Sequence, residues 1–139
     1  MRHGWLAIDP GITTGWALLD DDGDVLGTAV VGTHDVRKTL DTLVRVMYTK
    51  GIVLDVIVER MPNVGRMSGL SAQLEFVRKE IAAVIDTYEL RVTLVAPGEW
   101  KPSRVARTTQ LPRKWQGQSL TEHQQDAIRM GRYVMEAKE

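Results

Sequence analysis

Four side chains that can bind a divalent cation stand where a fold could bring them together. Asp9 ends a short apolar run, and Glu59 ends a longer run of mostly β-branched residues. His123 and Asp126 are three residues apart, a spacing that places both on one face of a helix. If the strands that end at Asp9 and Glu59 are neighbours, two carboxylates emerge near the centre of a sheet. Ionised carboxylates in such a place need partners, and a divalent cation is a good one.

The chemistry expected from this set is metal-dependent hydrolysis. Oxygen-rich sites suit Mg²⁺ or Mn²⁺, and a single imidazole favours tolerance of Mn²⁺. Two such ions would activate a water molecule and stabilise the leaving oxygen of a phosphodiester. Simpler interpretations remain open for each residue: Asp9 as a turn former before Pro10, Glu59 as the partner of an arginine, and the helical pair as a solvated face. The prediction therefore depends on all four occurring together.

Hydropathy patterns predict the elements that position these residues. The predicted strands cover residues 5–8, 16–19, 25–31, 53–58 and 92–95. The predicted helices cover residues 36–47 and 70–88, followed by a last helix that ends at about residue 135. Asp22-Gly23 is a hairpin turn signal, Gly51 is a helix stop, and Ser119-Leu-Thr-Glu122 has the form of a capping box. The order βββαβαβα predicts an α/β fold with a mixed five-stranded sheet flanked by helices.

Length and composition exclude several classes of protein. The chain has 139 residues, which predicts one compact domain over residues 1–139. It has no cysteine, so disulfides, thiolate zinc sites and cysteine nucleophiles are excluded, and a cytoplasmic location is expected. No apolar run is long enough to span a membrane, and the first residues lack the layout of a signal peptide.

Basic residues are concentrated in one segment, although the formal net charge is zero. The stretch from 101 to 114 contains five basic residues and no acidic one: Lys101, Arg104, Arg107, Arg113 and Lys114. Trp100 and Trp115 are interleaved with them, so we expect DNA contact, with cations on phosphates and an aromatic ring on a base. The alternative is a solvated loop whose tryptophans are anchored in the core.

A second predicted DNA contact is the glycine-containing loop that follows Glu59. Arg60 and Arg66 would lie beside the metals, and Met61 or Met67 would wedge against an unstacked base. The alternative is an ordinary loop with an exposed arginine.

The sequence resembles the RuvC family of Holliday junction resolvases over its whole length. Residues 7–17, Ala-Ile-Asp-Pro-Gly-Ile-Thr-Thr-Gly-Trp-Ala, resemble the opening strand and turn of that family. Val56-Ile-Val-Glu59 resembles the strand with the second acidic ligand, and His123-Gln-Gln-Asp-Ala127 resembles the C-terminal helix motif. Residues 95–101, Val-Ala-Pro-Gly-Glu-Trp-Lys, resemble a Pro-x-x-Val-Lys segment, with Trp100 in place of the aliphatic residue.

The resemblance implies an RNase H-like fold, a homodimer, and two-metal cleavage of symmetric strands at a DNA junction. Asp9 would bridge both Mg²⁺ ions, Glu59 and Asp126 would each help to hold one, and His123 would complete the site. Lys101 matches a basic residue that lies near the scissile phosphates in that family. The helix over residues 70–88 would contribute to the dimer interface, although the apolar stripe of this helix could equally be used within its own core.

Departures from the family pattern leave the substrate open. The chain is shorter than typical bacterial members and in this respect resembles the phage-encoded ones. The basic loop after Lys101 departs from the usual spacing, so flaps or forks are alternatives to four-way junctions. A non-catalytic DNA-binding module of the same fold is another alternative. The turn from Asp9 to Gly15 also resembles the phosphate-holding turn of actin-like and sugar-kinase ATPases, but those need two such domains.

Overall fold

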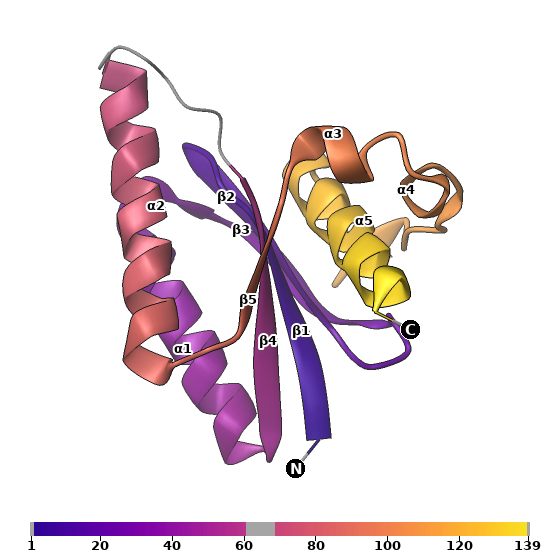
Figure 1. Cartoon of the computed structure of the whole chain (residues 1–139), viewed down its shortest axis with the longest axis horizontal. Coiled ribbons are helices and arrows are strands. Elements are labelled where there is room, and N and C mark those ends of the chain that lie inside the picture. The colour runs from indigo at the N-terminus through magenta and orange to yellow at the C-terminus, as the bar shows by residue number, and fades with distance from the viewer. Residues whose placement is uncertain (1, 61–68, 139) are drawn as a thin grey trace.

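The computed structural model describes residues 2–60 and 69–138, which form a mixed five-stranded sheet with helices on both faces (Figure 1). The strands of this sheet are β1 (Arg2–Asp9), β2 (Thr13–Leu19), β3 (Val25–Gly32), β4 (Ile52–Glu59) and β5 (Val92–Val95). The longer helices are α1 (Val36–Thr49), α2 (Gly69–Tyr88) and α5 (Glu122–Ala137), and a 3₁₀ turn, η1 (Thr33–Asp35), precedes α1. The predicted α/β fold and the order of its main elements are confirmed.

The sheet has the strand order β3-β2-β1-β4-β5. β1 pairs antiparallel with β2 and parallel with β4, while β4 pairs parallel with β5. The β2–β3 hairpin turns at Gly23, whose φ of 84° is a conformation that favours glycine. The ends of β1, β4 and β5 therefore meet at one edge of the sheet.

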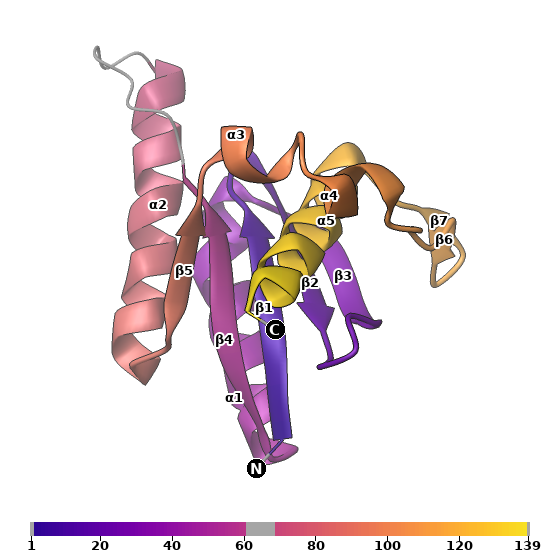
Figure 2. The ribbon, with the colours of Figure 1, turned by 45° about the vertical axis from the view of Figure 1, so that its right-hand side comes forward.

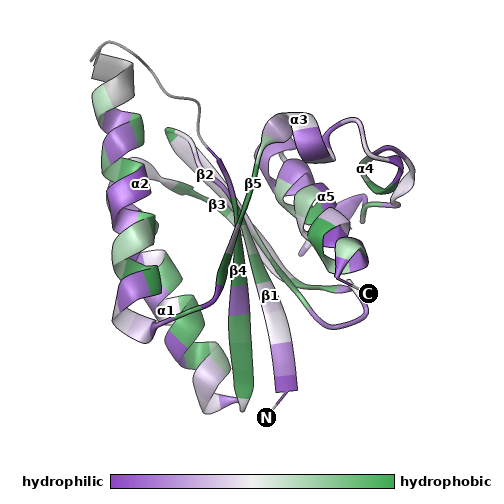
Figure 3. Ribbon diagram, in the orientation of Figure 1, coloured by the Kyte–Doolittle hydropathy of each residue, from purple (hydrophilic) through white to green (hydrophobic). Residues whose placement is uncertain are grey.

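Side chains of the central strands alternate between two hydrophobic cores. Leu6 and Ile8 point into the core beneath α1 and α2, while Ala7 and Ile57 point into the core beneath α5. Figure 1 shows α1 and α2 on one face of the sheet and α5 on the other. β4 is hydrophobic along most of its length because it is covered on both faces (Figure 3).

The helix α1 follows the predicted stripe. Its buried residues are Val36, Leu40, Val44 and Met47. The helix ends at Thr49, and Gly51 follows its C-cap with a φ of 76° that favours glycine and an N–H that donates to the carbonyl of Tyr48. The predicted helix and its stop signal are both confirmed.

The N-cap of α5 differs from the predicted one. The capping residue is Thr121, whose hydroxyl accepts from the N–H of Gln124, while the Gln124 side chain accepts from the N–H of Thr121. The predicted cap at Ser119 is wrong because Ser119 pairs with Lys114 in a short hairpin instead. A Thr-x-x-Gln capping box therefore starts α5 two residues later than expected.

The segment from 98 to 118, predicted to be irregular, contains regular structure. It includes α3 (Pro97–Trp100), α4 (Arg104–Thr108) and a hairpin of β6 (Lys114–Trp115) and β7 (Gln118–Ser119), which projects beside α5 in Figure 2. The prediction missed it because the anchors are single residues: Trp100 and Ala106 are buried in the α5-side core, and Ser103 caps α4. Among the described residues, no helix is both long enough and apolar enough to cross a membrane.

Candidate active site

Asp9 and Glu59 emerge side by side from two neighbouring parallel strands. Ile8 of β1 pairs with Val58 of β4, so the next residue of each strand lies at the same level of the sheet. Ala7 and Ile57 face α5, and the alternation of strand side chains puts Asp9 and Glu59 on that face too. The topology thus brings two carboxylates, 50 positions apart in the chain, to one edge beneath one helix.

The Asp9 side chain is buried and contacts the first turn of α5. Asp9 is 6% exposed, and its Oδ2 lies 2.9 Å from Nδ1 of His123. The turn that follows β1 is closed by Thr14, whose hydroxyl accepts from the N–H of Gly11 and donates to the carbonyl of Gly11. Thr14, and not Asp9, therefore closes this turn, and the Asp9 carboxylate contacts His123.

Glu59 is half-buried and is bound by an indole rather than by an arginine. The Nε1–H of Trp100, in α3, donates to Oε2 of Glu59 at 2.7 Å. Within residues 2–60 and 69–138, the other carboxylate oxygen of Glu59 accepts no hydrogen bond. The simpler alternative, in which an arginine pairs with Glu59, is therefore not found in this part of the chain.

Asp126 stands one turn after His123 on α5 and is also half-buried. The Nη1 of Arg129 lies 3.5 Å from Oδ1 of Asp126, a weak contact within the same helix. Asp126 therefore keeps most of its hydrogen-bonding capacity for other partners.

The pKa values of all three carboxyl groups are raised, and the charge of Asp9 contributes to the shifts of the other two. Burial raises the pKa of Asp9, although the hydrogen bond to His123 opposes this. Burial also raises the pKa of Glu59 and of Asp126, and the charge of Asp9 raises both further. Ionised carboxylates that are close together and partly buried are stabilised by a bound cation.

Among the described residues, Lys101 is a cation whose charge acts on all three carboxyl groups. Its charge lowers the pKa of Asp9, of Glu59 and of Asp126, in each case against the larger effect of burial. The Lys101 side chain is exposed, and its Nζ lies 5.6 Å from the ring centroid of Trp100. Arg129 also lowers the pKa of Asp126, but its charge does not act on Asp9 or Glu59, so the site has more carboxyl groups than nearby cations.

Trp100 is not available for base stacking. It is 1% exposed and belongs to the α5-side core, so the expected role of this ring on a DNA base is wrong. Trp115 packs against the edge of the same core and is half-buried. The interpretation of these tryptophans as core anchors is correct for Trp100 and partly so for Trp115.

The predicted DNA-binding residues of the described chain are exposed. They are Arg60, Lys101, Arg104, Arg107, Arg113 and Lys114. None of the ion pairs found within residues 2–60 and 69–138 involves any of them. The predicted contacts of Arg66, Met61 and Met67 lie outside the described residues.

A buried polar network that sequence patterns did not indicate fixes the start of α5. Gln124 is buried, and its side-chain nitrogen donates to the hydroxyl of Thr28 on β3 at 3.3 Å. That hydroxyl donates in turn to the carbonyl of Trp16 at 2.8 Å. The network ties the first turn of α5 to β2 and β3 and so helps to set the position of His123. A glutamine inside the capping box, next to the candidate ligand, was the available signal.

The tightest acidic cluster of the described residues lies elsewhere. Asp20, Asp22 and Asp24 place ligand atoms within 4.8 Å of one another, whereas the four predicted ligands do not form so tight a group. This cluster is the β2–β3 turn, where Oδ1 of Asp20 accepts from the N–H groups of Asp22 and Asp24. These carboxylates stabilise the turn and lie away from Asp9 and Glu59, the last residues of β1 and β4.

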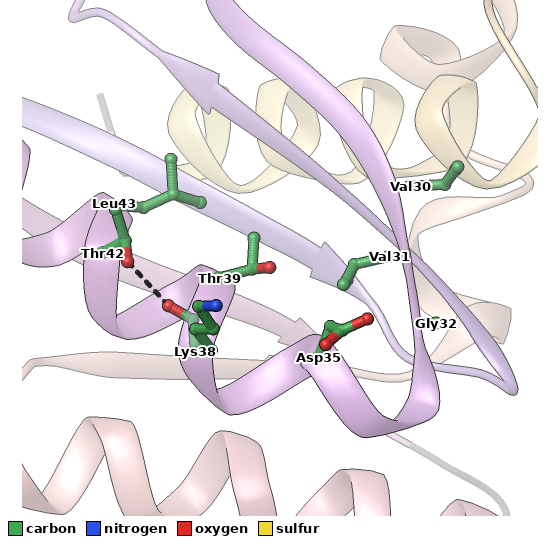
Figure 4. Close-up of a pocket in the computed structure, with 8 residues that line it drawn as sticks. All are labelled: Val30, Val31, Gly32, Asp35, Lys38, Thr39, Thr42 and Leu43. Atoms are coloured by element: carbon green, nitrogen blue, oxygen red, sulfur yellow. Dashed lines mark hydrogen bonds between the residues drawn. The ribbon is translucent and has the colours of Figure 1, made fainter.

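A cavity of about 490 Å³ lies on the opposite side of the sheet from α5. It is lined by β3 and α1 residues, among them Asp35, Lys38 and Thr39 (Figure 4). None of the predicted site residues lines it. The cavity is therefore separate from the carboxylates.

The donor set at the strand ends fits Mg²⁺ or Mn²⁺. It offers carboxylate oxygens from Asp9, Glu59 and Asp126 and one imidazole nitrogen from His123, which is the ligand chemistry of these ions. The raised carboxyl pKa values also favour a metal site, because a divalent cation would stabilise the ionised carboxylates. The residues present therefore fit the metal that the sequence predicts.

Comparisons with known proteins agree with this architecture. No protein-family model matches the sequence, and neither does any curated protein sequence. Among solved structures, RuvC of Thermus thermophilus in complex with a Holliday junction substrate superimposes with a TM-score of 0.74 and 13% identity, covering 99% of this chain and 96% of that one. A second structure of Thermus thermophilus RuvC has a TM-score of 0.66 and 16% identity and covers 97% and 95% of the two chains. The chain therefore has the RNase H-like fold of RuvC.

Proposed function

We propose that this protein is a metal-dependent endonuclease that cuts Holliday junctions or closely related branched DNA. One observation carries the proposal: Asp9, Glu59, His123 and Asp126 come from three elements, and their carboxylates act on one another at the edge of the sheet where β1 and β4 end. The likeness in fold to a RuvC that is solved with a Holliday junction supports the choice of branched DNA as substrate.

Asp9, Glu59, Asp126 and His123 are the proposed ligands of two Mg²⁺ ions, with Mn²⁺ as a substitute. When bound, the ions supply the positive charge that activates water and stabilises a leaving alkoxide. Asp9 is the proposed shared ligand because it is the most central, buried between Gly15 of β2 and the end of β4.

The side chains orient the reacting groups in complementary ways. His123 Nδ1 is held at 2.9 Å from Asp9, which directs its ring nitrogens and fixes the first turn of α5 over the carboxylates. Lys101 places an ammonium group at the rim, where it would bind a non-bridging oxygen of the scissile phosphate. Its exposure leaves it accessible to DNA.

The segment after Lys101 is the proposed DNA-binding surface. It presents the exposed cations Arg104, Arg107, Arg113 and Lys114 on α4 and the β6–β7 hairpin, next to α5 (Figure 2). Arg60 adds an exposed cation directly after Glu59. Such cations neutralise phosphates and make affinity depend on salt. The neutral net charge is compatible with this, because five basic residues and no acidic one are concentrated in residues 101–114.

A homodimer is the proposed assembly, since two symmetric cuts require two active sites. Apolar side chains are exposed on the edge strand β5 and on α2: Val92 is 44% exposed, Leu94 is 53% exposed and Phe76 is 42% exposed. A dimer would bury them. Sedimentation equilibrium of the wild type against Leu94→Glu tests this assembly, with a monomeric wild type as the contradicting result. The proposed substrate is intracellular DNA, which fits the cytoplasmic location expected from the lack of cysteine.

The experiment that tests the proposed activity compares cleavage rates on four synthetic substrates: a four-way junction, a flap, a fork and a linear duplex, with and without Mg²⁺. The proposal predicts Mg²⁺-dependent cutting of the junction that is lost in Asp9→Asn while junction binding remains. A faster rate on flaps or forks would keep the chemistry and change the substrate. Binding without cutting by the wild type would indicate a non-catalytic module.

A further inference from the structure

Trp100 is the most completely buried aromatic residue that contacts a candidate ligand. Its side chain is 1% exposed and fills the core between the sheet and α5. The one polar atom of the indole, Nε1, donates to Oε2 of Glu59 at 2.7 Å. A hydrogen bond from a buried donor to a carboxylate is strong because the donor faces an ionised acceptor.

We propose that Trp100 is a positioning residue for the metal site. Its indole N–H binds one oxygen of Glu59 and so directs the other toward Asp9 and Asp126, and its ring supports Lys101 through a cation–π contact. This inference rests on the proposed function, because it assigns a role in binding the Mg²⁺ ions of that site. It concerns a contact that joins residues 41 positions apart.

The backbone holds both partners of this contact in one place. Glu59 pairs with Val95 across β4 and β5, and the N–H of Arg60 donates to the carbonyl of Val95 at 2.7 Å. The helix α3 begins two residues after Val95 and ends at Trp100. This short connection places the indole next to Glu59 at the end of β4. The carboxylate of Glu59 is therefore fixed from its own strand and from the segment that follows β5.

A hydrogen bond to one carboxylate oxygen occupies a lone pair of that oxygen and orients the whole group. Oε2 of Glu59 accepts from the indole, so Oε1 is the less occupied oxygen and the proposed metal-binding atom. Groups that bond to metal ligands orient them, and their loss typically weakens metal binding by about 10- to 100-fold. Trp100 would act on Glu59 in this way.

A second buried tryptophan shows that the fold does not need an acceptor for each indole. Trp16 of β2 is 9% exposed, and its Nε1 has no hydrogen-bond partner among the described residues. It packs in the core on the other face of the sheet. Trp16→Phe is therefore a matched control, since it removes a buried indole N–H that bonds to nothing in residues 2–60 and 69–138.

The same ring also supports Lys101. The Nζ of Lys101 lies 5.6 Å from the centroid of the Trp100 ring, which is within the range of a cation–π interaction. The position of an otherwise exposed lysine is thus coupled to the indole. Trp100→Phe keeps an aromatic ring for this contact and removes the donor to Glu59 together with part of the ring volume, and Trp16→Phe controls for the loss of volume.

The test measures Mn²⁺ binding to the full chain by isothermal titration calorimetry, without DNA. Trp100→Phe should weaken Mn²⁺ binding by about 10-fold or more. Trp16→Phe should leave it within about twofold of the wild type, a difference of less than ~0.5 kcal/mol by the relation between affinity and free energy. Equal affinities of the two variants, both folded by circular dichroism, would overturn the inference.

A measurement on the intact indole covers the case in which Trp100→Phe fails to fold. In ¹⁵N-labelled wild type, the four tryptophans give four indole N–H resonances, and single Trp→Phe changes at positions 5, 16 and 115 assign Trp100 by elimination. Addition of Mg²⁺ should shift the Trp100 resonance more than the Trp16 one, and Glu59→Gln should abolish that shift. An unshifted Trp100 resonance at saturating Mg²⁺ would overturn the inference.

Failure of this inference and failure of the proposed function give different results. If the wild type binds Mn²⁺ and cuts junctions, and Trp100→Phe and Trp16→Phe bind Mn²⁺ with equal affinity, only the role of Trp100 is excluded. Wild type that binds Mn²⁺ in a Trp100-dependent way but cuts no DNA keeps that role and removes the nuclease. Wild type that binds neither Mn²⁺ nor Mg²⁺ removes both.

Discussion

The backbone of His123 lies directly on Gly15. A Cβ built on Gly15 would stand 2.5 Å from both the carbonyl carbon and the carbonyl oxygen of His123, closer than real Cβ atoms approach. Gly15 pairs with Asp9 across β1 and β2, so the missing side chain sits beside the most buried carboxylate of the site. The close approach of α5 to the sheet is what lets His123 reach Asp9.

Gly15→Ala should displace the first turn of α5 and open the contact between His123 and Asp9. Overpacking of this kind costs about 1–3 kcal/mol of stability. We expect that loss in urea unfolding and at least a tenfold loss of junction cleavage at a temperature where the variant is folded. Gly27→Ala is the control, because its Cβ would lie at an ordinary 3.5 Å from the Trp16 ring. Unchanged cleavage by Gly15→Ala would contradict the account of how α5 is placed.

The raised carboxyl pKa values predict how Mg²⁺ and pH act together on stability. Because folding raises the pKa of Asp9, Glu59 and Asp126, the folded chain binds protons more readily than the unfolded one. Stability of the metal-free protein should therefore fall as pH rises from the ordinary carboxyl range, about 4, through the raised values. Mg²⁺ should restore it where the carboxylates are ionised.

The measurement is the thermal midpoint with Mg²⁺ minus the midpoint with chelator, followed against pH. At magnesium 100 times above its Kd we expect a gain of about 5–10 °C near pH 7.5. The gain should shrink toward zero near pH 4, about where ordinary carboxyl groups take up protons. The triple variant Asp9→Asn, Glu59→Gln, Asp126→Asn should have no gain at either pH. A gain that is independent of pH would speak against these ligands.

Arg107 offers a test of the DNA-binding surface apart from the chemistry. It is exposed on α4, and its removal should weaken junction binding and reduce the slope of log K against log salt by about 1. Arg37→Ala is the matched control, an exposed arginine on α1 at the opposite face of the sheet. Equal salt slopes for the two variants would remove α4 from the interface.

Much of the fold could be predicted because its signals are local. Apolar runs that stop at Asp9 and Glu59 mark the ends of the central strands, and a 3.6-residue stripe marks α1. Likewise, the three-residue spacing of His123 and Asp126 predicts their common helix face.

The contacts that set the geometry of the site could not be predicted, because they join distant segments. The bond from Trp100 to Glu59 spans 41 positions, and that from Gln124 to Thr28 spans 96. A tryptophan in a basic segment has the same local pattern whether it stacks on DNA or fills a core, and burial decides it. Ser119 and Thr121 are each followed three residues later by a Glu or Gln, and the pairing of Ser119 in the hairpin decides between them.

The most direct test of the central claim is the location of Mn²⁺ by anomalous diffraction in crystals of the full chain. We expect anomalous peaks bounded by Asp9, Glu59 and Asp126, with His123 as a further ligand, and loss of those peaks in Asp9→Asn. The competing place is the acidic turn, where Asp20, Asp22 and Asp24 hold ligand atoms within 4.8 Å of one another. Peaks at that turn alone, or none at the ends of β1 and β4, would contradict the account.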